Sequence, residues 1–186
     1  MGDPKRLRKK YDRPLKPWQK QRILEEVKLM KEFGLRRKKE IWIAAAILRK
    51  YRNIAKEIIK LRSANDPRAK TLQEELFEIL SKYGLINKED AHVEDVLNLT
   101  VRDILNRRLQ TLVYKKGLAR TPKQARQLIV HKHIMVGDKV VAAPSYLVTV
   151  EEENKIQFHP NSKYLEAYTT RQVVKANNES ENNEGQ

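Results

Sequence analysis

The stretch from Arg120 to Val141, which reads RTPKQARQLIVHKHIMVGDKVV, contains five basic residues and two histidines, and four of the basic residues lie between a helix start and a hairpin turn. Arginine and lysine side chains hydrogen-bond to phosphate oxygens. Arginine can also grip a phosphate with two parallel donors or stack on an unpaired base. Because no nucleophile or paired carboxylate accompanies them, the chemistry that this stretch predicts is the binding of a polyanion.

Catalytic and metal-binding side chains are scarce in the rest of the sequence. The chain contains no cysteine, which excludes thiolate nucleophiles, thiolate zinc sites and disulfides. Glu74 and Glu78 share a helix face at i,i+4 spacing beside Glu75, but no second ligand cluster accompanies them, so we interpret them as an exposed face. His131 and His133 are spaced for opposite sides of a helix end. We therefore expect no metal, no cofactor and no small-molecule substrate.

The charge of the chain is large and unevenly distributed. Its 39 Lys and Arg against 24 Asp and Glu give a formal net charge of +15. Residues 1–62 hold 21 basic and 7 acidic residues and residues 103–149 hold 9 and 2, whereas residues 63–102 and 150–186 have an acidic excess. This segregation favours a polyanionic partner over a merely solvated surface.

Nothing in the sequence indicates insertion into a membrane. No apolar run approaches the roughly 20 residues that a helix needs to span a bilayer. The N-terminal sequence MGDPKRLRKKYDRP lacks the apolar stretch of a signal peptide. We expect a soluble cytoplasmic protein without a membrane partner.

A short helix should position the basic residues of the opening stretch. Thr121 is a good N-cap, Pro122 suits the first helical position, and Gln124 can complete a capping box. The helical period places three apolar residues on one side, with Val130 exposed: Ala125, Leu128 and Ile129. It turns three long polar side chains to the far side, with His131 on the flank: Lys123, Arg126 and Gln127.

A small twisted sheet should follow this helix. Gly137-Asp138 is a two-residue hairpin signal between apolar strands at 134–136 and 139–141. Pro144 and Ser145 separate these strands from a further strand expected at Tyr146–Val150. After an acidic turn, EEEN, a last strand is expected at Ile156–His159.

The first half of the chain predicts an extended basic arm over residues 1–16 and a series of helices. These helices are expected at 17–34, where Pro17 takes the first position, and at 38–62, 66–84 and 100–117. Along the second helix, four basic residues form a line that either follows phosphates or is simply solvated: Arg49, Arg52, Lys56 and Lys60. The aromatic residues of this half are interpreted as packing residues rather than base platforms: Tyr11, Trp18, Trp42 and Tyr51.

The order of these features resembles the α-L RNA-binding domain, which is named after the fourth protein of the small ribosomal subunit. The matching residues are Leu105, Arg108, Leu109, Gly117, Leu118, Arg120, Thr121, Ala125, Arg126, Gln127, Ile129, His131, Ile134, Val136, Gly137, Val140 and Pro144-Ser145. They cover about a third of the chain at fixed spacing. In that family a helix pair and its connecting loop present basic side chains to structured RNA.

Other segments extend the resemblance to nearly the whole chain except its tail. The segments KRLRKKYDRPLKPW, EFGLRRKKEIW and LTVRDILNRRLQTLVYKKGLA are similar to the S-four family of small-subunit ribosomal proteins in its archaeal or eukaryotic form. Enzymes that carry an α-L domain have a far larger catalytic domain, whereas residues 1–102 are basic helices without a nucleotide-binding glycine-rich loop. We therefore expect a structural protein and no enzyme. The alternatives are an accessory module of an RNA-modification enzyme and a stand-alone RNA chaperone.

The resemblance implies an α+β protein that binds small-subunit ribosomal RNA at a helix junction in its 5′ domain, nucleates assembly and contributes to decoding fidelity, with protein S-five among its neighbours. Three segments are expected: a basic helical domain over 1–102, the α-L domain over 103–175 and a disordered tail over 176–186. The RNA-binding residues implied in the α-L domain are Arg107, Arg108, Arg120, Lys123, Arg126, Gln127, His131 and Lys132. Further candidates on the same basic segments are Lys115, Lys116, Thr121, Lys139, Arg36, Arg37, Lys38, Lys39, Arg49, Arg52, Lys56 and Lys60.

Overall fold

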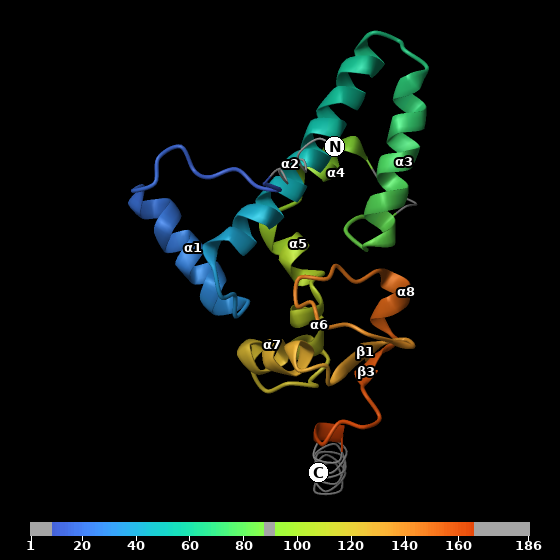
Figure 1. Cartoon of the computed structure of the whole chain (residues 1–186). Helices are drawn as coiled ribbons and strands as arrows, with labels where there is room; N and C mark the ends of the chain where they lie inside the picture. Colours follow the sequence, from blue (N-terminus) through green and yellow to red (C-terminus); the bar gives the residue numbers. More distant parts are fainter. Residues whose placement is uncertain (1–8, 88–91, 166–186) are drawn as a thin grey trace, which may run out of the picture. The chain divides into compact units, whose positions relative to one another are not determined.

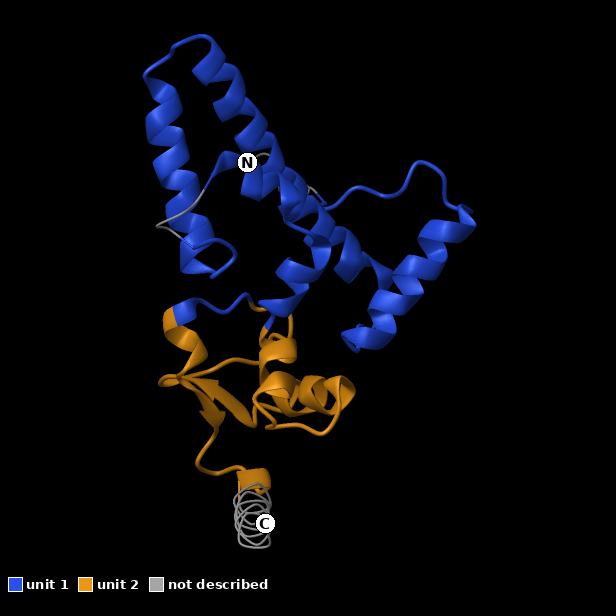
Figure 2. Ribbon diagram, turned by 180° about the vertical axis from the view of Figure 1, so that it is seen from behind, with its two compact units in different colours: residues 1–108, 147–150 blue, residues 109–146, 151–186 orange. Residues whose placement is uncertain are grey.

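The computed structural model of the chain describes residues 9–87 and 92–165 (Figure 1). The chain divides into two units, one of residues 1–108 with 147–150 and one of residues 109–146 with 151–186 (Figure 2). The first unit is helical and the second carries helices and a small sheet, so the expected α+β class is confirmed. The first 8 residues of the arm and the segment 176–186 lie outside the described residues.

Helix α2 is the centre of the first unit. The helices of this unit are α1 (Lys20–Glu32), α2 (Lys38–Ser63), α3 (Arg68–Lys82), α4 (Val93–Asn98) and α5 (Val101–Asn106). Helix α2 packs against each of the other four, and Figure 1 shows α3 running beside its second half. The apolar stripe that predicted a helix at 38–62 is the side that α2 buries, including Ile41, Leu48 and Ile58. These residues share one core with Leu76 and Leu80 of α3.

Two expectations for the first unit need correction, and one helix was missed. Pro17 does not begin α1, which starts at Lys20, because the Arg22 guanidinium holds the carbonyls of Lys16 and Pro17 in a turn before the helix. Helix α4 was not expected. The helix expected at 100–117 is broken at Arg107 and Arg108, where the chain bridges to Leu147 instead of continuing its helical hydrogen bonds.

The packing role expected for tryptophan holds for one of the two. The Trp42 indole donates from Nε1 to Glu26 Oε1 at 2.9 Å, and its ring lies 5.9 Å from the ring of Tyr11. Trp18, in contrast, is 89% exposed, so its interpretation as a packing residue is wrong. The turn that precedes α1 carries this indole into solvent.

The second unit packs two helices on a three-stranded antiparallel sheet. Its elements are α6 (Leu109–Lys115), α7 (Pro122–Val130), β1 (Ile134–Val136), β2 (Lys139–Val140) and β3 (Ile156–Phe158), and α8 (Val150–Glu153) begins at the unit boundary. Strand β1 is central, with β2 and β3 on either side. Met135 pairs with Val140 and Val136 with Lys139, so Gly137-Asp138 forms the expected two-residue hairpin loop, and Gly137 has a φ of 59°.

The segment 146–150 is not the expected strand. Leu147 makes an isolated bridge with Arg108, and the Val148 N–H donates to the Arg107 carbonyl at 3.0 Å. The backbone of this segment is thus bound to the break between α5 and α6 and does not join the sheet. The expected acidic turn is the short helix α8, in which Glu151, Glu152 and Glu153 occupy the first turn, where the helix dipole favours negative charge.

Candidate nucleic-acid interface

Helix α7 is positioned at its N-terminus by the cap that the sequence predicts. The Gln124 N–H donates to the Thr121 hydroxyl at 3.2 Å, and Pro122 follows the cap as the first helical residue. The Gln124 side chain reaches back and accepts from the Arg120 N–H at 2.9 Å. The backbone on both sides of Thr121 is therefore fixed, and the side chains of Arg120 and Lys123 start from a rigid turn.

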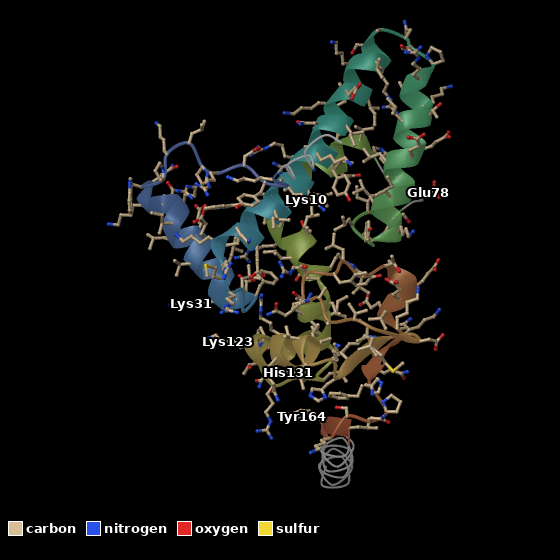
Figure 3. All side chains as sticks on the ribbon, viewed as in Figure 1. Lys10, Lys31, Glu78, Lys123, His131 and Tyr164 are labelled. Carbon is tan, nitrogen blue, oxygen red and sulfur yellow. The ribbon has the colours of Figure 1, made fainter. Side chains whose placement is uncertain are left out.

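The two sides of α7 differ as its amphipathic pattern requires. Ala125, Leu128 and Ile129 are buried against the core of the second unit, and Val130 is 50% exposed as expected. Arg126 is half-buried. Apart from the cap residue Thr121, the exposed polar residues of α7 and its two ends, which we call the α7 surface, are Arg120, Lys123, Gln127, His131 and Lys132. Figure 3 shows Lys123 on α7 and His131 just beyond its last turn.

The C-terminal end of α7 places Lys132 in an unusual backbone conformation. Lys132 has a φ of 62°, in the left-handed region that glycine prefers. Its N–H donates to the Ile129 carbonyl at 3.0 Å, and the His133 N–H donates to the Leu128 carbonyl at 2.9 Å, so this residue ends the helix. The Lys132 side chain leaves this tight turn exposed to solvent.

His133 belongs to a small cluster with the end of the described chain. Its Nδ1 lies 3.1 Å from the Ser162 hydroxyl, and its ring makes a T-shaped contact with the Tyr164 ring, with the ring centroids 4.9 Å apart. The His131 and His133 rings are 6.5 Å apart. Within residues 9–87 and 92–165, no group of three or more His, Asp and Glu side chains is arranged to hold a metal ion.

Four other candidates in the basic segment 103–149 differ in exposure. Lys115 and Lys139 are exposed. Lys116 is half-buried and donates from Nζ to the Glu153 carbonyl. Arg107 is half-buried and donates from Nη2 to the Val148 carbonyl at 3.2 Å.

Arg108 lies in the interior of the first unit. It is 5% exposed, and its Nη2 donates to Glu40 Oε2 at 2.7 Å. This ion pair ties the break after α5 to the first turn of α2. Because the guanidinium has an internal partner and little exposure, Arg108 does not belong to the exposed basic surface.

The candidates in the first unit form two groups. Before and at the start of α2, Arg36, Arg37 and Lys39 are exposed, while Lys38 lies 3.3 Å from Glu26 Oε2. Farther along α2, Lys56 and Lys60 are exposed and Arg49 makes a solvent-accessible ion pair with Asp12 at 2.6 Å.

Arg52 does not point into solvent with the other basic residues of the line expected along α2. Its Nη2 donates to the Leu99 carbonyl at 2.6 Å. We call Arg49, Lys56 and Lys60 the α2 line.

Glu26 is a structural centre that the sequence analysis did not identify. It is 5% exposed and its carboxylate accepts from Trp42 Nε1 and, at 2.5 Å, from Arg22 Nη1. Burial raises the pKa of Glu26, but the hydrogen bonds from Trp42, Arg22 and Lys38 outweigh burial and hold the pKa below its ordinary value. The sequence did contain a signal for this role. Glu26 lies four residues after Arg22, on the side of α1 where the apolar residues recur.

The described helices are not of the kind that crosses a membrane, since none within residues 9–87 and 92–165 is both long and apolar enough.

Two family models match the chain in succession. Residues 2–105 match the ribosomal protein S4/S9 N-terminal domain, and residues 107–154 match the S4 domain. The second match contains the whole α7 surface, the hairpin and α8.

Curated archaeal relatives are similar over most of the chain. Small ribosomal subunit protein uS4 of Ignicoccus hospitalis is 49% identical over 166 residues, which are 89% of this chain and 97% of that protein. The uS4 proteins of Methanococcus aeolicus and Saccharolobus solfataricus are 51% and 50% identical, over 87% and 88% of this chain and 90% and 89% of their own lengths.

These matches distinguish among the alternatives that the sequence left open. The relatives that cover 87–89% of this chain are named as small-subunit ribosomal proteins and not as modification enzymes. The expectations of a ribosomal protein and of no enzymatic activity are confirmed. The chain therefore belongs to the family of the small ribosomal subunit protein uS4.

Proposed function

We propose that this small-subunit ribosomal protein binds small-subunit ribosomal RNA at a helix junction in the 5′ domain, mainly through the α7 surface. The observation that carries this proposal is the arrangement of α7. Five exposed polar side chains stand on a capped helix and its ends, while the opposite side is held in a core by Ala125, Leu128 and Ile129. Side chains on such a rigid element lose little freedom when they bind, which favours recognition of a folded RNA by its shape.

The α2 line and the basic turn at 36–39 supply a second contact region in this proposal. Lys56 and Lys60 follow Arg49 on one face of α2, and each can neutralise a phosphate. Two separate basic regions would let one chain hold more than one RNA helix of a junction.

A role in assembly follows from such a binding mode, and the family resemblance adds a role in decoding. A protein that holds several RNA helices in one arrangement restricts their motion relative to one another. The surrounding RNA then folds around helices that are already ordered, so the bound protein nucleates its folding. We propose that the protein acts in this way early in small-subunit assembly in the cytoplasm and influences decoding fidelity. The family resemblance adds neighbouring small-subunit proteins, with protein S-five among them, as partners.

The test compares two double variants on one RNA. Arg120→Ala with Lys123→Ala removes two charges from the α7 surface, and Lys155→Ala with Lys163→Ala removes two exposed charges elsewhere in the second unit. Binding to a transcript of the small-subunit 5′ domain should weaken by about 3–6 kcal/mol in the first variant, since two charge-assisted contacts of about 1.5–3 kcal/mol each are lost.

The control pair decides whether the site or only the net charge matters. Neither pair contributes to the core, so unfolding midpoints of both variants should stay near that of the unchanged protein. Filter binding at one fixed salt concentration measures the affinities. If both pairs weaken binding equally, the assignment of the site to the α7 surface is withdrawn.

A further inference from the structure

The turn before α1 exposes a large apolar side chain among cations. Trp18 is 89% exposed and Leu15 is fully exposed. Between Arg13 and Lys20 the sequence RPLKPWQK contains three basic residues and no acidic residue. A tryptophan is the side chain that loses most by standing in water, so its exposure in a basic segment calls for a partner with a flat apolar face and negative charge nearby.

This turn is held in place by a chain of contacts that ends in α2. Arg22 Nη2 donates to the carbonyls of Lys16 and Pro17 at 3.0 and 2.8 Å. Arg22 Nη1 donates to the buried Glu26, which also accepts from Trp42 Nε1 of α2.

Two prolines restrict the same turn. Pro14 and Pro17 lie on either side of Leu15 and Lys16, and each locks its own backbone φ. Together with the Arg22 contacts they fix the backbone that carries Trp18. The indole is thus presented by a restrained loop and does not pack against the helix.

Beside the turn lies a hollow of about 560 Å³ with a strongly basic wall. Four cations line it, of which Arg49 is paired with Asp12, the single carboxylate among its lining residues, and Arg22 with Glu26 of α1. These cations are Arg13, Lys16, Arg22 and Arg49. A sugar-phosphate segment has the charge that complements this wall.

We infer that Trp18 is a stacking platform for an unpaired base of the ribosomal RNA, with the phosphates on either side of that base held along the basic hollow. The inference rests on the proposed function, because it names one nucleotide contact of the same RNA. Every base offers a π face, so stacking needs no particular sequence, and lysine or arginine beside the ring holds the backbone. Glu26 and Arg22 are positioning residues for this platform, since they hold the turn and not the base.

The experiment uses the full chain and a transcript of the small-subunit 5′ domain. Trp18→Ala should weaken binding roughly 5- to 150-fold, the range expected when one stacked base is lost. Trp18→Phe keeps an aromatic face and should recover most of the affinity. Unfolding midpoints should hardly change, because the indole is exposed.

Salt dependence separates stacking from charge. Removing an uncharged indole releases no counterion, so the slope of log K against log salt should be the same for Trp18→Ala and the unchanged protein. The matched variant Lys16→Ala removes a neighbouring cation and should make that slope shallower by about 0.7–0.9. In addition, RNA should quench tryptophan emission in the unchanged protein, and this quenching should be lost in Trp18→Phe.

Several results would overturn the inference. If the unchanged protein binds the transcript and Trp18→Ala binds it equally well, the platform is wrong and the proposed function stands. If Trp18→Ala keeps its RNA affinity but is incorporated poorly into small subunits, the indole contacts a protein neighbour instead of a base. If the unchanged protein prefers the transcript no more than an unrelated RNA of equal length, the proposed function and this inference fall together.

Discussion

Lys132 adopts a backbone conformation that glycine adopts far more readily. Its φ of 62° costs a non-glycine residue about 1 kcal/mol or more, and the turn that ends α7 requires it. We predict that Lys132→Gly raises the free energy of unfolding by up to about 1 kcal/mol and weakens binding to the 5′-domain transcript, because the charge is lost while the strain is relieved. Thermal unfolding and filter binding measure the two effects.

Lys132→Ala is the matched control for that prediction. Alanine removes the same charge but keeps the penalty of the left-handed conformation, so affinity should fall as in Lys132→Gly without the gain in stability. Equal stability of the two variants would show that the backbone at 132 is not strained.

The ion pair of Arg108 and Glu40 makes a second prediction at the residue scale. Both side chains are nearly buried, and the pair joins the end of α5 to the start of α2. Removing the cation alone, by Arg108→Met, leaves a carboxylate in the interior and should cost about 3–5 kcal/mol of unfolding free energy. Chemical denaturation measures this cost.

The double variant shows whether the cost belongs to the unpaired charge. Arg108→Met with Glu40→Leu replaces both charges by apolar groups, and it should recover most of the stability that Arg108→Met loses. If the single variant loses less than about 1 kcal/mol, the carboxylate is solvated and the interior placement of this pair is wrong.

At the scale of elements, helix α1 is attached to α2 through polar contacts as well as apolar ones. The residue that α1 buries is Glu26, whose carboxylate is bound by Trp42 and Lys38 of α2 and by Arg22 of α1 itself. The attachment of α1 therefore depends on the charge of one carboxylate. It should respond to pH in the acidic range.

The sign of this response follows from the pKa of Glu26. Its pKa is lowered in the folded protein, so Glu26 contributes stability that is present above the ordinary carboxylate pKa and is lost as pH falls through the lowered value. We predict that stability falls on acidification below about pH 4.5 and that Glu26→Gln reduces this slope, because glutamine does not titrate. Denaturant unfolding followed by tryptophan emission at a series of pH values tests this.

The matched control is an exposed carboxylate of the same helix. Glu25→Gln removes the same charge from a position without the Trp42 contact and should leave the acid slope unchanged. An identical slope in the unchanged protein and Glu26→Gln would mean that the carboxylate does not hold α1.

Long, strongly periodic elements were the predictable ones. Helix α2 has 26 residues, and its apolar stripe located it to within one residue. The cap at Thr121 and the loop at Gly137-Asp138 were equally clear, because their local chemistry determines the conformation. Helix α4 has only 6 residues, so Val93 and Val96 gave too short a period to be recognised.

The errors arose where contacts distant in sequence decide the structure. The apolar pattern at 146–150 resembles a strand, but its backbone groups are taken by the break at Arg107. The candidate site shows the same division. The helical period separated the exposed residues of the α7 surface from the core, but no local pattern indicated that Arg108 would be paired with Glu40 or that Trp18 would be left in solvent.

At the scale of the whole molecule, the net charge of +15 should dominate association with RNA. The α7 surface and the exposed residues around α2 present basic side chains in both units, so the proposed binding would neutralise phosphates at several points. Each neutralised phosphate releases condensed counterions, and this release is the part of the affinity that added salt opposes. Contacts that depend on stacking or shape are much less affected.

We therefore predict that affinity for the 5′-domain transcript falls steeply and linearly in log salt. If about six to ten phosphates are contacted, the affinity should drop by roughly 10³- to 10⁵-fold between about 50 and 200 mM salt. Arg120→Ala with Lys123→Ala should make the slope of log K against log salt shallower by the amount expected for the loss of nearly two phosphate contacts. Lys155→Ala with Lys163→Ala should leave the slope close to that of the unchanged protein. A slope near zero would contradict the electrostatic basis of binding, and equal slopes in the two double variants would mean that the phosphates lie elsewhere than along α7.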